Sequence, residues 1–248
     1  MEENKQYEHR YIVFIDILGF KNFVEESEEN EDQLKNIHEA LNYISRIKRE
    51  NDEGTLSLKD MGKEVTVFSD SIVISMPVSN NSEGWILLNE VIFLQINLMN
   101  LGICIRGGMT AGKLYHKENI VFGPAMNEAY NLESNCAIYP RVIVSSNYLE
   151  TVYRYGNPLP EIEHDYYKDY LDLLKEDQDG NFYVDFLNQE LNVDGREEYL
   201  NFLEKTKNSI IQNLDKYNKK PQILMKYKWL KEYFNKTCEI TGFNSFRI

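Results

Sequence analysis

A two-residue connection between two apolar runs is the feature of this sequence that most restricts its fold. Residues 64–68 and 71–76 both have the composition of strands, and only Ser69 and Asp70 separate them. A link this short joins antiparallel neighbours in a hairpin, whereas parallel neighbours need a crossover of about a dozen residues or more. The chain is therefore not expected to form a doubly wound parallel sheet, in which strands and helices alternate.

The elements around the hairpin are ordered as in an α+β sandwich. The first strand is a nearly continuous apolar run at residues 11–16, and it ends in the carboxylate of Asp16. Helices are expected at residues 31–49, 83–100 and 125–134, and further strands at 103–111, 119–122 and 141–145. Ser82 is expected to cap the second of these helices. The order βααββαβ(β)αβ indicates helices packed on an antiparallel or mixed sheet.

The composition of the chain changes after about residue 150. Residues 160–180 are acidic and rich in tyrosine, residues 181–186 could form a strand, and residues 196–217 and 222–235 have the pattern of helices. We therefore expect a core domain over residues 1–150. Residues 151–248 are expected to form a C-terminal helical elaboration packed on the same domain.

The charge of the chain argues against nucleic-acid binding. The 248 residues include 27 Lys and Arg and 40 Asp and Glu, so the formal net charge is −13. Nonspecific binding to nucleic acid needs a basic face that displaces counterions from phosphates. The most apolar stretch, residues 85–101, is interrupted by polar side chains and is expected to form an amphipathic helix rather than a membrane span. We expect a soluble, cytoplasmic protein.

Two aspartates stand where strand ends are expected to meet. Asp16 ends the first strand, just before a Gly-containing turn at residues 17–20, and backbone N–H groups of such a turn can hold a phosphate. Asp70 lies at the tip of the hairpin. If the hairpin pairs with the first strand, the two carboxylates converge, and hard cations such as Mg²⁺ or Mn²⁺ prefer oxygen ligands. The alternative is that Asp16 caps the next helix and Asp70 is a turn residue.

Polar residues elsewhere in the chain are weaker indications of a ligand. Asn127 and Asn131 lie four apart on one helix face, where their amides could contact a ribose or a phosphate, or form an exposed polar face. Gly107 and Gly108 follow Arg106 in a strand, and glycines weaken a strand unless another backbone or a ligand comes close. The sequence has neither GxxxxGK[ST] nor GxGxxG, so the P-loop and Rossmann folds are not indicated.

Four short segments occur in a suggestive order along the chain. They are Phe14-Ile-Asp-Ile-Leu-Gly-Phe20, Phe68-Ser-Asp-Ser71, Arg106-Gly-Gly-Met-Thr-Ala-Gly112 and Gly123-Pro-Ala-Met-Asn-Glu-Ala-Tyr-Asn-Leu-Glu133. In this order and spacing they resemble the catalytic domain of the class III nucleotidyl cyclases, over about residues 11 to 146. The resemblance implies a ferredoxin-like sandwich for the core domain and a head-to-tail homodimer with composite active sites.

The resemblance also implies which residues bind the nucleotide and its metals. Asp16 and Asp70 match the metal-binding aspartates, the Ile17 carbonyl is a further ligand, and two Mn²⁺ or Mg²⁺ ions are expected per active site. Asn127 matches the asparagine that orients the ribose. The other implied nucleotide contacts are Ile17, Leu18, Gly19 and Phe20 of the turn, and Phe68. In such enzymes the metals activate the 3′-hydroxyl and support the triphosphate, so that pyrophosphate leaves.

The chain departs from the family at three positions. Asn131 takes the place of an arginine that stabilises the transition state, so another segment has to supply that charge or turnover is slow, and Arg141 is the candidate cation. The two positions that read adenine in adenylyl cyclases hold Thr66 and Ile120. Thr66 could still hydrogen-bond a base edge, but an adenylyl cyclase is not indicated.

The absence of these purine-reading residues resembles the pyrimidine cyclases of bacterial Pycsar antiphage systems. Those short cyclases make cyclic UMP or cyclic CMP, which a separate effector reads. We therefore expect a signal generator in antiphage defence that acts on a pyrimidine nucleoside triphosphate, with a uridylate cyclase favoured over a cytidylate cyclase. It is expected to bind neither nucleic acid nor membranes.

Two other functions compete with an active cyclase. The first is a nucleotide-binding or dimerisation module that kept the fold and lost catalysis, which the departure at Asn131 favours and the retention of both aspartates disfavours. The second is another palm-like phosphoryl-transfer enzyme with paired carboxylates. The net charge of −13 disfavours a template-binding polymerase, and the sequence shows no GGDEF-like signature.

Overall fold

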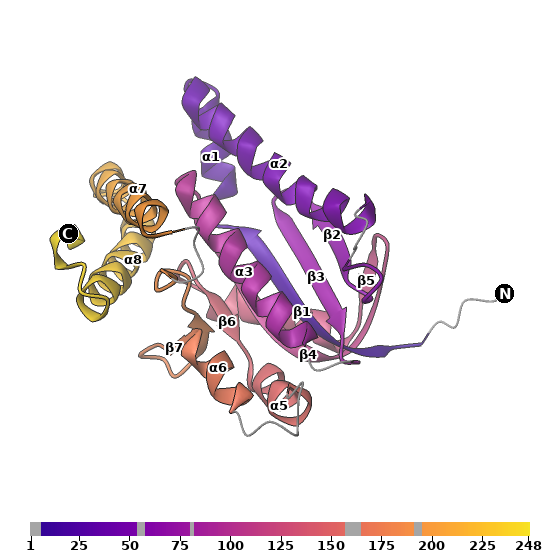
Figure 1. Ribbon diagram of the computed structural model, residues 1–248. Coiled ribbons are helices and arrows are strands. Elements are labelled where there is room, and N and C mark those ends of the chain that lie inside the picture. Colours follow the sequence, from indigo (N-terminus) through magenta and orange to yellow (C-terminus); the bar gives the residue numbers. More distant parts are fainter. Residues whose placement is uncertain (1–5, 54–57, 80–81, 157–164, 191–194) are drawn as a thin grey trace.

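The computed structural model describes residues 6–53, 58–79, 82–156, 165–190 and 195–248 (Figure 1). The helices are α1 (Phe20–Ser27), α2 (Glu31–Glu53), α3 (Glu83–Asn100), α4 (Pro124–Asn131), α5 (Ser146–Tyr155), α6 (Tyr166–Asp172), α7 (Arg196–Lys216) and α8 (Pro221–Ile240). The strands are β1 (Glu8–Ile17), β2 (Glu64–Phe68), β3 (Ser71–Pro77), β4 (Ile105–Lys117), β5 (Ile120–Phe122), β6 (Val142–Val144), β7 (Leu174–Glu176) and β8 (Phe182–Val184). A π-helical turn, η1 (Leu132–Cys136), follows α4, and a 3₁₀ turn, η2 (Asn244–Phe246), lies near the C-terminus.

One mixed sheet organises the fold. Its strands lie in the order β2-β3-β1-β4-β6-β8-β7, and β5 pairs with β4 outside this path. The described pairings are antiparallel except the one between β4 and β6. The first four strands and the helices between them have the βαββαβ arrangement of a ferredoxin-like sandwich. The α+β class and the hairpin predicted from the sequence are both confirmed.

The alternation of side chains along β1 divides the core into two layers. Val13 and Ile15 belong to the larger hydrophobic cluster, which also contains the buried faces of α2 and α3. Figure 1 shows α3 crossing in front of β1 and β3. Phe14 faces the opposite way and packs in a smaller cluster with Ala125 and Ala129 of α4. The face of the sheet that carries α4 is therefore the more thinly covered one.

Gly107 and Gly108 are required by close backbone approaches and not by a ligand. A Cβ atom on Gly107 would lie 2.6 Å from the Phe14 carbonyl oxygen of the neighbouring strand. A Cβ atom on Gly108 would lie 2.5 Å from the Ala129 carbonyl oxygen and 2.5 Å from Cβ of Leu132. The second glycine thus lets α4 pack directly on β4.

Gly108→Ala is expected to lower the free energy of unfolding by about 1–3 kcal/mol, because the added methyl group overpacks the contact between β4 and α4. Urea denaturation followed by circular dichroism would measure the change. Gly112→Ala is the matched control on the same strand face, because its added Cβ would meet only Ala125 Cβ, at an ordinary 3.4 Å. Equal stability losses in the two variants would contradict the prediction.

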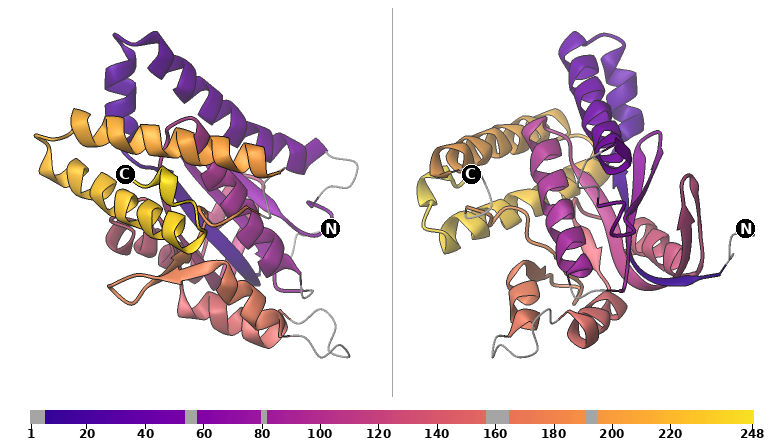
Figure 2. Two further views of the ribbon diagram at one scale, coloured as in Figure 1. Left: turned by 60° about the vertical axis from the view of Figure 1, so that its left-hand side comes forward. Right: turned by 45° about the vertical axis from the view of Figure 1, so that its right-hand side comes forward.

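The C-terminal residues extend the same sheet and the same core. β8 pairs antiparallel with β6, and β7 pairs with β8. Phe202 of α7 and Phe234 of α8 are buried in the same hydrophobic cluster as Val13 of β1. Figure 2 shows α7 and α8 lying side by side beyond α3. The region expected to be helical thus also supplies two strands, and α5 runs through residue 150, where the sequence placed a boundary.

Two local predictions differ from the structure. Ser82 precedes α3, but its side chain caps nothing, because its backbone is already helical (φ −106°, ψ −17°) and not extended, so the predicted cap is wrong. The helix predicted over residues 125–134 ends as an α-helix at Asn131 and continues as the π-helical turn to Cys136. Within the described ranges, none of the helices combines the length and the hydropathy needed to cross a bilayer.

Candidate active site

Four side chains form a row across the strand ends on the α4 face of the sheet. Phe68 of β2 pairs with Ser71 of β3, Ser71 pairs with Asp16 of β1, and Asp16 pairs with Arg106 of β4. Cross-strand partners share a face of a sheet, so this row lies beside the layer that contains α4. The Ser71 hydroxyl donates a hydrogen bond to Asp16 Oδ1 at 3.1 Å, which orients the carboxylate.

A backbone hydrogen bond ties the hairpin tip to the end of β1. The Ile17 N–H donates to the Asp70 carbonyl oxygen at 3.1 Å. Ser69 adopts φ +44° in the same turn, a left-handed conformation that is uncommon for a residue other than glycine. The turn thus brings Asp70 to the last two residues of β1, Asp16 and Ile17, and its charge acts on the Asp16 carboxyl.

The electrostatics around Asp16 show an excess of negative charge. The pKa of the Asp16 carboxyl is raised to about 6, first by burial and then by the negative charges of Asp70 and Glu133. The Ser71 hydrogen bond and the positive charge of Arg106 oppose this shift. Asp16 and Glu133 share one guanidinium, and Asp70 adds a third negative charge nearby, so the site favours an additional cation.

Arg106 and Glu133 are components of this site that the sequence did not assign. Arg106 Nη2 lies 2.7 Å from Glu133 Oε1 and 3.7 Å from Asp16 Oδ2. Glu133 is only 3% exposed, and the Arg106 Nε is buried with no hydrogen-bond partner among the described residues. The sequence marked Arg106 only through the glycines that follow it. Its role emerges from the pairing of β4 with β1, which sequence spacing alone does not provide.

The turn after Asp16 leaves a helix N-terminus open. The Leu18 N–H is used by the Cys104 carbonyl oxygen at 2.9 Å, and Gly19 adopts φ +80°, which glycine permits. α1 begins at the next residue, Phe20, and no side chain of the described residues caps it. Uncapped N–H groups at a helix start attract an anion such as phosphate. The predicted phosphate-binding turn therefore lies directly beside the aspartates.

The oxygen donors fit a divalent cation. Asp16 and Asp70 offer carboxylates, and the Ile17 carbonyl lies in the same turn, although no cluster of three metal-binding side chains occurs among the described residues. Mg²⁺ and Mn²⁺ commonly take one or two carboxylates and fill the other positions with water and substrate phosphates. The raised pKa of Asp16, caused first by burial and then by its acidic neighbours, indicates that a cation would stabilise this arrangement.

Thr66 is held in a buried hydrogen-bonded chain. It is 1% exposed, and its hydroxyl accepts from His116 Nε2 at 2.9 Å and donates to the Glu118 carbonyl oxygen at 2.9 Å. The Ser75 hydroxyl bonds to His116 Nδ1 at 2.8 Å and accepts from Arg10 Nε at 2.9 Å. Because the Thr66 hydroxyl gives its hydrogen to the Glu118 carbonyl, it accepts from His116 Nε2, which therefore carries a proton. Burial keeps the ring neutral, so Nδ1 accepts from the Ser75 hydroxyl. In this arrangement the Thr66 hydroxyl has no free hydrogen for a base edge.

The neutral state of His116 predicts a pH-dependent stability. Burial, and then the charges of Arg10 and Lys48, lower the pKa of His116 to about 3. The unfolded state binds the proton below a pKa of about 6.5 and the folded state does not, so stability is full above that pH and is lost as pH falls. Between pH 7.5 and pH 5 the loss is expected to be about 2 kcal/mol.

Urea denaturation at each pH would measure this loss, and His116→Gln is the comparison, because its Nε2 can still donate to Thr66. In the variant, the decrease in the free energy of unfolding between pH 7.5 and pH 5 is expected to be smaller by about 2 kcal/mol. Identical pH profiles for the two proteins would contradict the buried neutral histidine.

The other predicted nucleotide contacts are dispersed. Phe68 is 46% exposed at the end of the row, and Ile120 is 60% exposed on β5. Asn127 and Asn131 are exposed on α4, and Asn131 Oδ1 accepts a hydrogen bond from Asn135 Nδ2 at 2.7 Å. In the described part of the chain, no hydrogen bond joins either α4 asparagine to the aspartates. Within the described part of one copy, these two groups are therefore not joined by a hydrogen bond.

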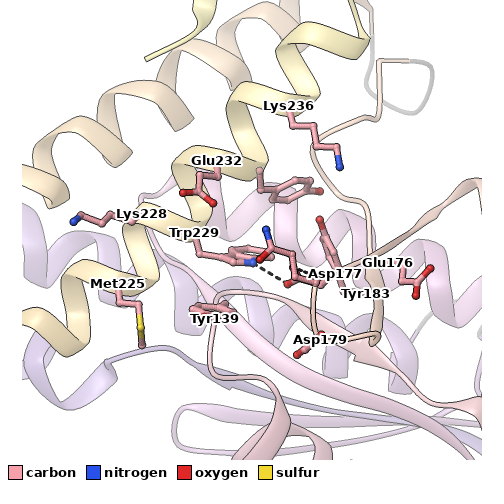
Figure 3. A pocket seen from close by; sticks show the side chains of 12 residues that line it. Tyr139, Glu176, Asp177, Asp179, Tyr183, Met225, Lys228, Trp229, Glu232 and Lys236 are labelled. Atoms are coloured by element: carbon pink, nitrogen blue, oxygen red, sulfur yellow. Dashed lines mark hydrogen bonds between the residues drawn. The ribbon is translucent and has the colours of Figure 1, made fainter.

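Arg141 lies in a different cluster. Its guanidinium is 1% exposed, pairs with Asp177 and Asp179 and donates to the Cys136 carbonyl oxygen at 3.2 Å. The Arg141 hydrogen bond is also the main cause that lowers the pKa of Asp179 to about 2. Both aspartates line a pocket of about 480 Å³ between the β7–β8 turn and α8, and Trp229 contributes to its wall (Figure 3). The structure thus does not bring Arg141 to Asp16 and Asp70.

Comparisons with known proteins find similarity only at the level of three-dimensional structure. No protein-family model matches the sequence, and no curated protein matches it. A bacterial light-regulated adenylyl cyclase has 15% identity and a TM-score of 0.43, covering 82% of this chain and 99% of its own. The guanylyl cyclase domain of the RhoGC fusion protein from the aquatic fungus Blastocladiella emersonii has 14% identity and a TM-score of 0.44, covering 73% and 96%. A class III adenylyl cyclase-like ATP-binding protein from Pseudomonas aeruginosa has 12% identity and a TM-score of 0.43, covering 61% and 37%.

Proposed function

We propose that the chain is a nucleotidyl cyclase that converts a pyrimidine nucleoside triphosphate to its 3′,5′-cyclic monophosphate and pyrophosphate. The observation that carries the proposal is the meeting of Asp16 and Asp70 at one end of the sheet, where the Ile17 N–H binds the Asp70 carbonyl oxygen. An uncapped helix start and the guanidinium of Arg106 flank this pair. Carboxylates for metals and donors for phosphates therefore occur together.

The reaction is a displacement at phosphorus within one substrate molecule. The 3′-hydroxyl gives its proton to solvent, its oxygen bonds to the α-phosphorus, and the bond from that phosphorus to the bridging oxygen of the β-phosphate breaks. Two Mn²⁺ or Mg²⁺ ions, when bound, would activate the hydroxyl and offset the charge of the triphosphate. Asp16 and Asp70 would hold them together with the Ile17 carbonyl. Arg106, which is fixed by Glu133, would contact the phosphates.

The substrate preference is argued from the positions that read adenine in the resembling family. Thr66 has its hydroxyl fully used by His116 and the Glu118 carbonyl, and Ile120 is apolar. Neither side chain offers a hydrogen bond to a purine edge, which supports UTP or CTP as the substrate, with UTP preferred. The product would be cyclic UMP or cyclic CMP. By resemblance to the Pycsar cyclases, a separate effector would read it in antiphage defence.

A homodimer is part of the proposal. Asn127, the proposed ribose contact, is exposed, and no hydrogen bond of the described residues joins it to the aspartates of its own chain. Head-to-tail pairing of two copies would place it against the site of the other copy and create two equivalent sites. Large exposed side chains on the same face support an interface there: Phe68 is 46% exposed, and Tyr130, which packs on Phe14, is 54% exposed.

The test is to incubate the purified protein with ATP, GTP, CTP and UTP separately, in the presence of Mn²⁺, and to identify the products by mass spectrometry. A cyclic pyrimidine monophosphate together with pyrophosphate is the expected result. Cyclic AMP or cyclic GMP as the main product would contradict the substrate assignment. No product from any of the four would favour the second candidate, a nucleotide-binding module without catalysis, which the amide at Asn131 already favours.

A further inference from the structure

A single nitrogen atom of Arg106 faces two carboxylates at the candidate site. Arg106 Nη2 lies 2.7 Å from Glu133 Oε1 and 3.7 Å from Asp16 Oδ2. The first distance is that of a close ion pair, whereas the second is too long for a hydrogen bond. The other oxygen of Asp16, Oδ1, accepts from the Ser71 hydroxyl at 3.1 Å. Asp16 Oδ2 is therefore an oxygen that the guanidinium approaches without forming a hydrogen bond.

Burial explains why the guanidinium lies closer to Glu133 than to Asp16. The side chain of Glu133 is 3% exposed, and that of Asp16 is 20% exposed. A buried charge that loses its counter-ion is strongly destabilising, so the more deeply buried carboxylate retains the cation. The Ser134 hydroxyl also donates to Glu133 Oε2 at 2.6 Å, which fixes the carboxylate in this position.

The backbone brings Glu133 to Arg106 through a glycine and a π-helical turn. Arg106 lies two residues before Gly108 on β4 and therefore on the same face of the sheet. A Cβ atom on Gly108 would lie 2.5 Å from Cβ of Leu132, so the start of η1 packs directly on this strand. The Ala137 N–H donates to the Leu132 carbonyl oxygen at 2.8 Å, which closes the π-helical turn. Such turns are frequent at functional sites, and Glu133 is the second residue of this one.

We infer that Glu133 is a positioning residue, which holds the Arg106 guanidinium away from Asp16 and so keeps Asp16 Oδ2 available for a divalent cation. The inference rests on the proposed function, in which Asp16 and Asp70 hold the metal ions. Without the charge of Glu133, Asp16 is the carboxylate with which Arg106 still pairs among the described residues. The guanidinium would then move onto Asp16, because it binds carboxylates through charge-assisted hydrogen bonds. Arg106 and a metal ion would compete for the same oxygen.

The first test is a crystal structure of the metal-free Glu133→Gln protein, in which the side chain keeps its length and loses its charge. A guanidinium nitrogen of Arg106 is expected within about 3 Å of an Asp16 carboxylate oxygen, at hydrogen-bond distance. A guanidinium that stays as far from Asp16 as it is now would overturn the inference.

The second test measures Mn²⁺ binding without nucleotide, by the decrease of the electron paramagnetic resonance signal of the free ion. Glu133→Gln is expected to raise the Kd for Mn²⁺ by about 10-fold to 100-fold, the usual range for removing a group that orients a metal ligand. Glu128→Gln is the matched control. It removes one negative charge from α4, where the Glu128 carboxylate accepts from Asn147 Nδ2 at 2.9 and 3.0 Å, and it should leave the Kd unchanged.

Arg106→Gln separates the position of the guanidinium from the charge of Glu133. In that background Glu133→Gln should change the Kd for Mn²⁺ by about threefold or less, the effect of one charge acting across water. An equal loss of affinity in both backgrounds would show that Glu133 acts through its charge alone and would overturn the inference, as would no Mn²⁺ binding by the unchanged protein. Circular dichroism melting shows whether each variant is folded, and the crystal structure of the Glu133→Gln protein decides the question without Arg106→Gln.

The inference and the proposed function can fail separately. If Mn²⁺ binding changes as expected but no nucleotide is cyclised, the proposed function fails and the role of Glu133 at the metal site stands. If a nucleotide is cyclised but Glu133→Gln affects neither Mn²⁺ binding nor the position of Arg106, the inference fails and the proposed function stands.

Discussion

Asp70→Asn is expected to lower the turnover of the proposed cyclase by about 100-fold to 1,000-fold, the usual range for removing one electrostatic contact to the transition state. The substitution takes one carboxylate from the pair that would bind the divalent ions. It keeps the backbone carbonyl, which accepts the Ile17 N–H, so the hairpin tip stays tied to β1. The measurement is the rate of cyclic nucleotide formation from UTP and from CTP with Mn²⁺.

The fold of the Asp70→Asn protein should be at least as stable as the original, because the charge of Asp70 is one of the causes that raise the pKa of Asp16. Asp60→Asn, an exposed substitution in the turn before β2, controls for the general loss of one negative charge. Full activity in the Asp70→Asn protein would remove the argument for metal-binding carboxylates. Loss of activity in the Asp60→Asn protein would show that the assay reports net charge and not the site.

Arg141→Ala is expected to lower the free energy of unfolding by about 3–5 kcal/mol, because breaking a buried ion pair leaves its partner uncompensated. Arg141 is 1% exposed and its partner Asp177 is 15% exposed, whereas Asp179 is 44% exposed and contributes less. The change also removes the guanidinium that lies 5.9 Å from the Trp229 ring centroid. Urea denaturation would measure the loss.

The matched control for this change is Arg154→Ala. Arg154 forms an exposed pair with Glu150 one helical turn away, at 3.7 Å, and is expected to change stability by less than about 0.5 kcal/mol. If the Arg141→Ala protein had normal stability but no activity, the result would instead support a role for Arg141 in the active site. A large loss of stability, with activity retained in the folded fraction, would support its structural role.

The sequence was sufficient for those parts of the fold that local pattern determines. The two-residue link between β2 and β3 permits only a hairpin, and pairing of that hairpin with β1 brings Asp70 to Asp16. Arg106 could not be assigned in this way, because its place beside Asp16 depends on which strands are neighbours in the sheet.

Burial was the second property that the sequence did not reveal. Thr66 is a polar residue at a position that reads a base in the resembling family, and the sequence suggested a similar contact. In the structure, Thr66 is buried against His116. His116 reaches it because β4 is long enough to include this residue. Arg141 was likewise suggested as the missing cation because it follows the α4 helix closely in the sequence. The acidic turn between β7 and β8 pairs with Arg141, and no sequence pattern indicated that the two lie together.

The pairing of β8 with β6 has a consequence for any shortened form of this protein. β6 contains only Val142, Ile143 and Val144, and β8 covers one side of it through pairs with Tyr183 and Phe182. A chain that ended near residue 150 would leave this apolar strand at an open edge, with unpaired N–H and C=O groups that can template the strand of another molecule. Such a fragment is expected to self-associate, so a shortened form of the protein has to retain β8 to cover β6.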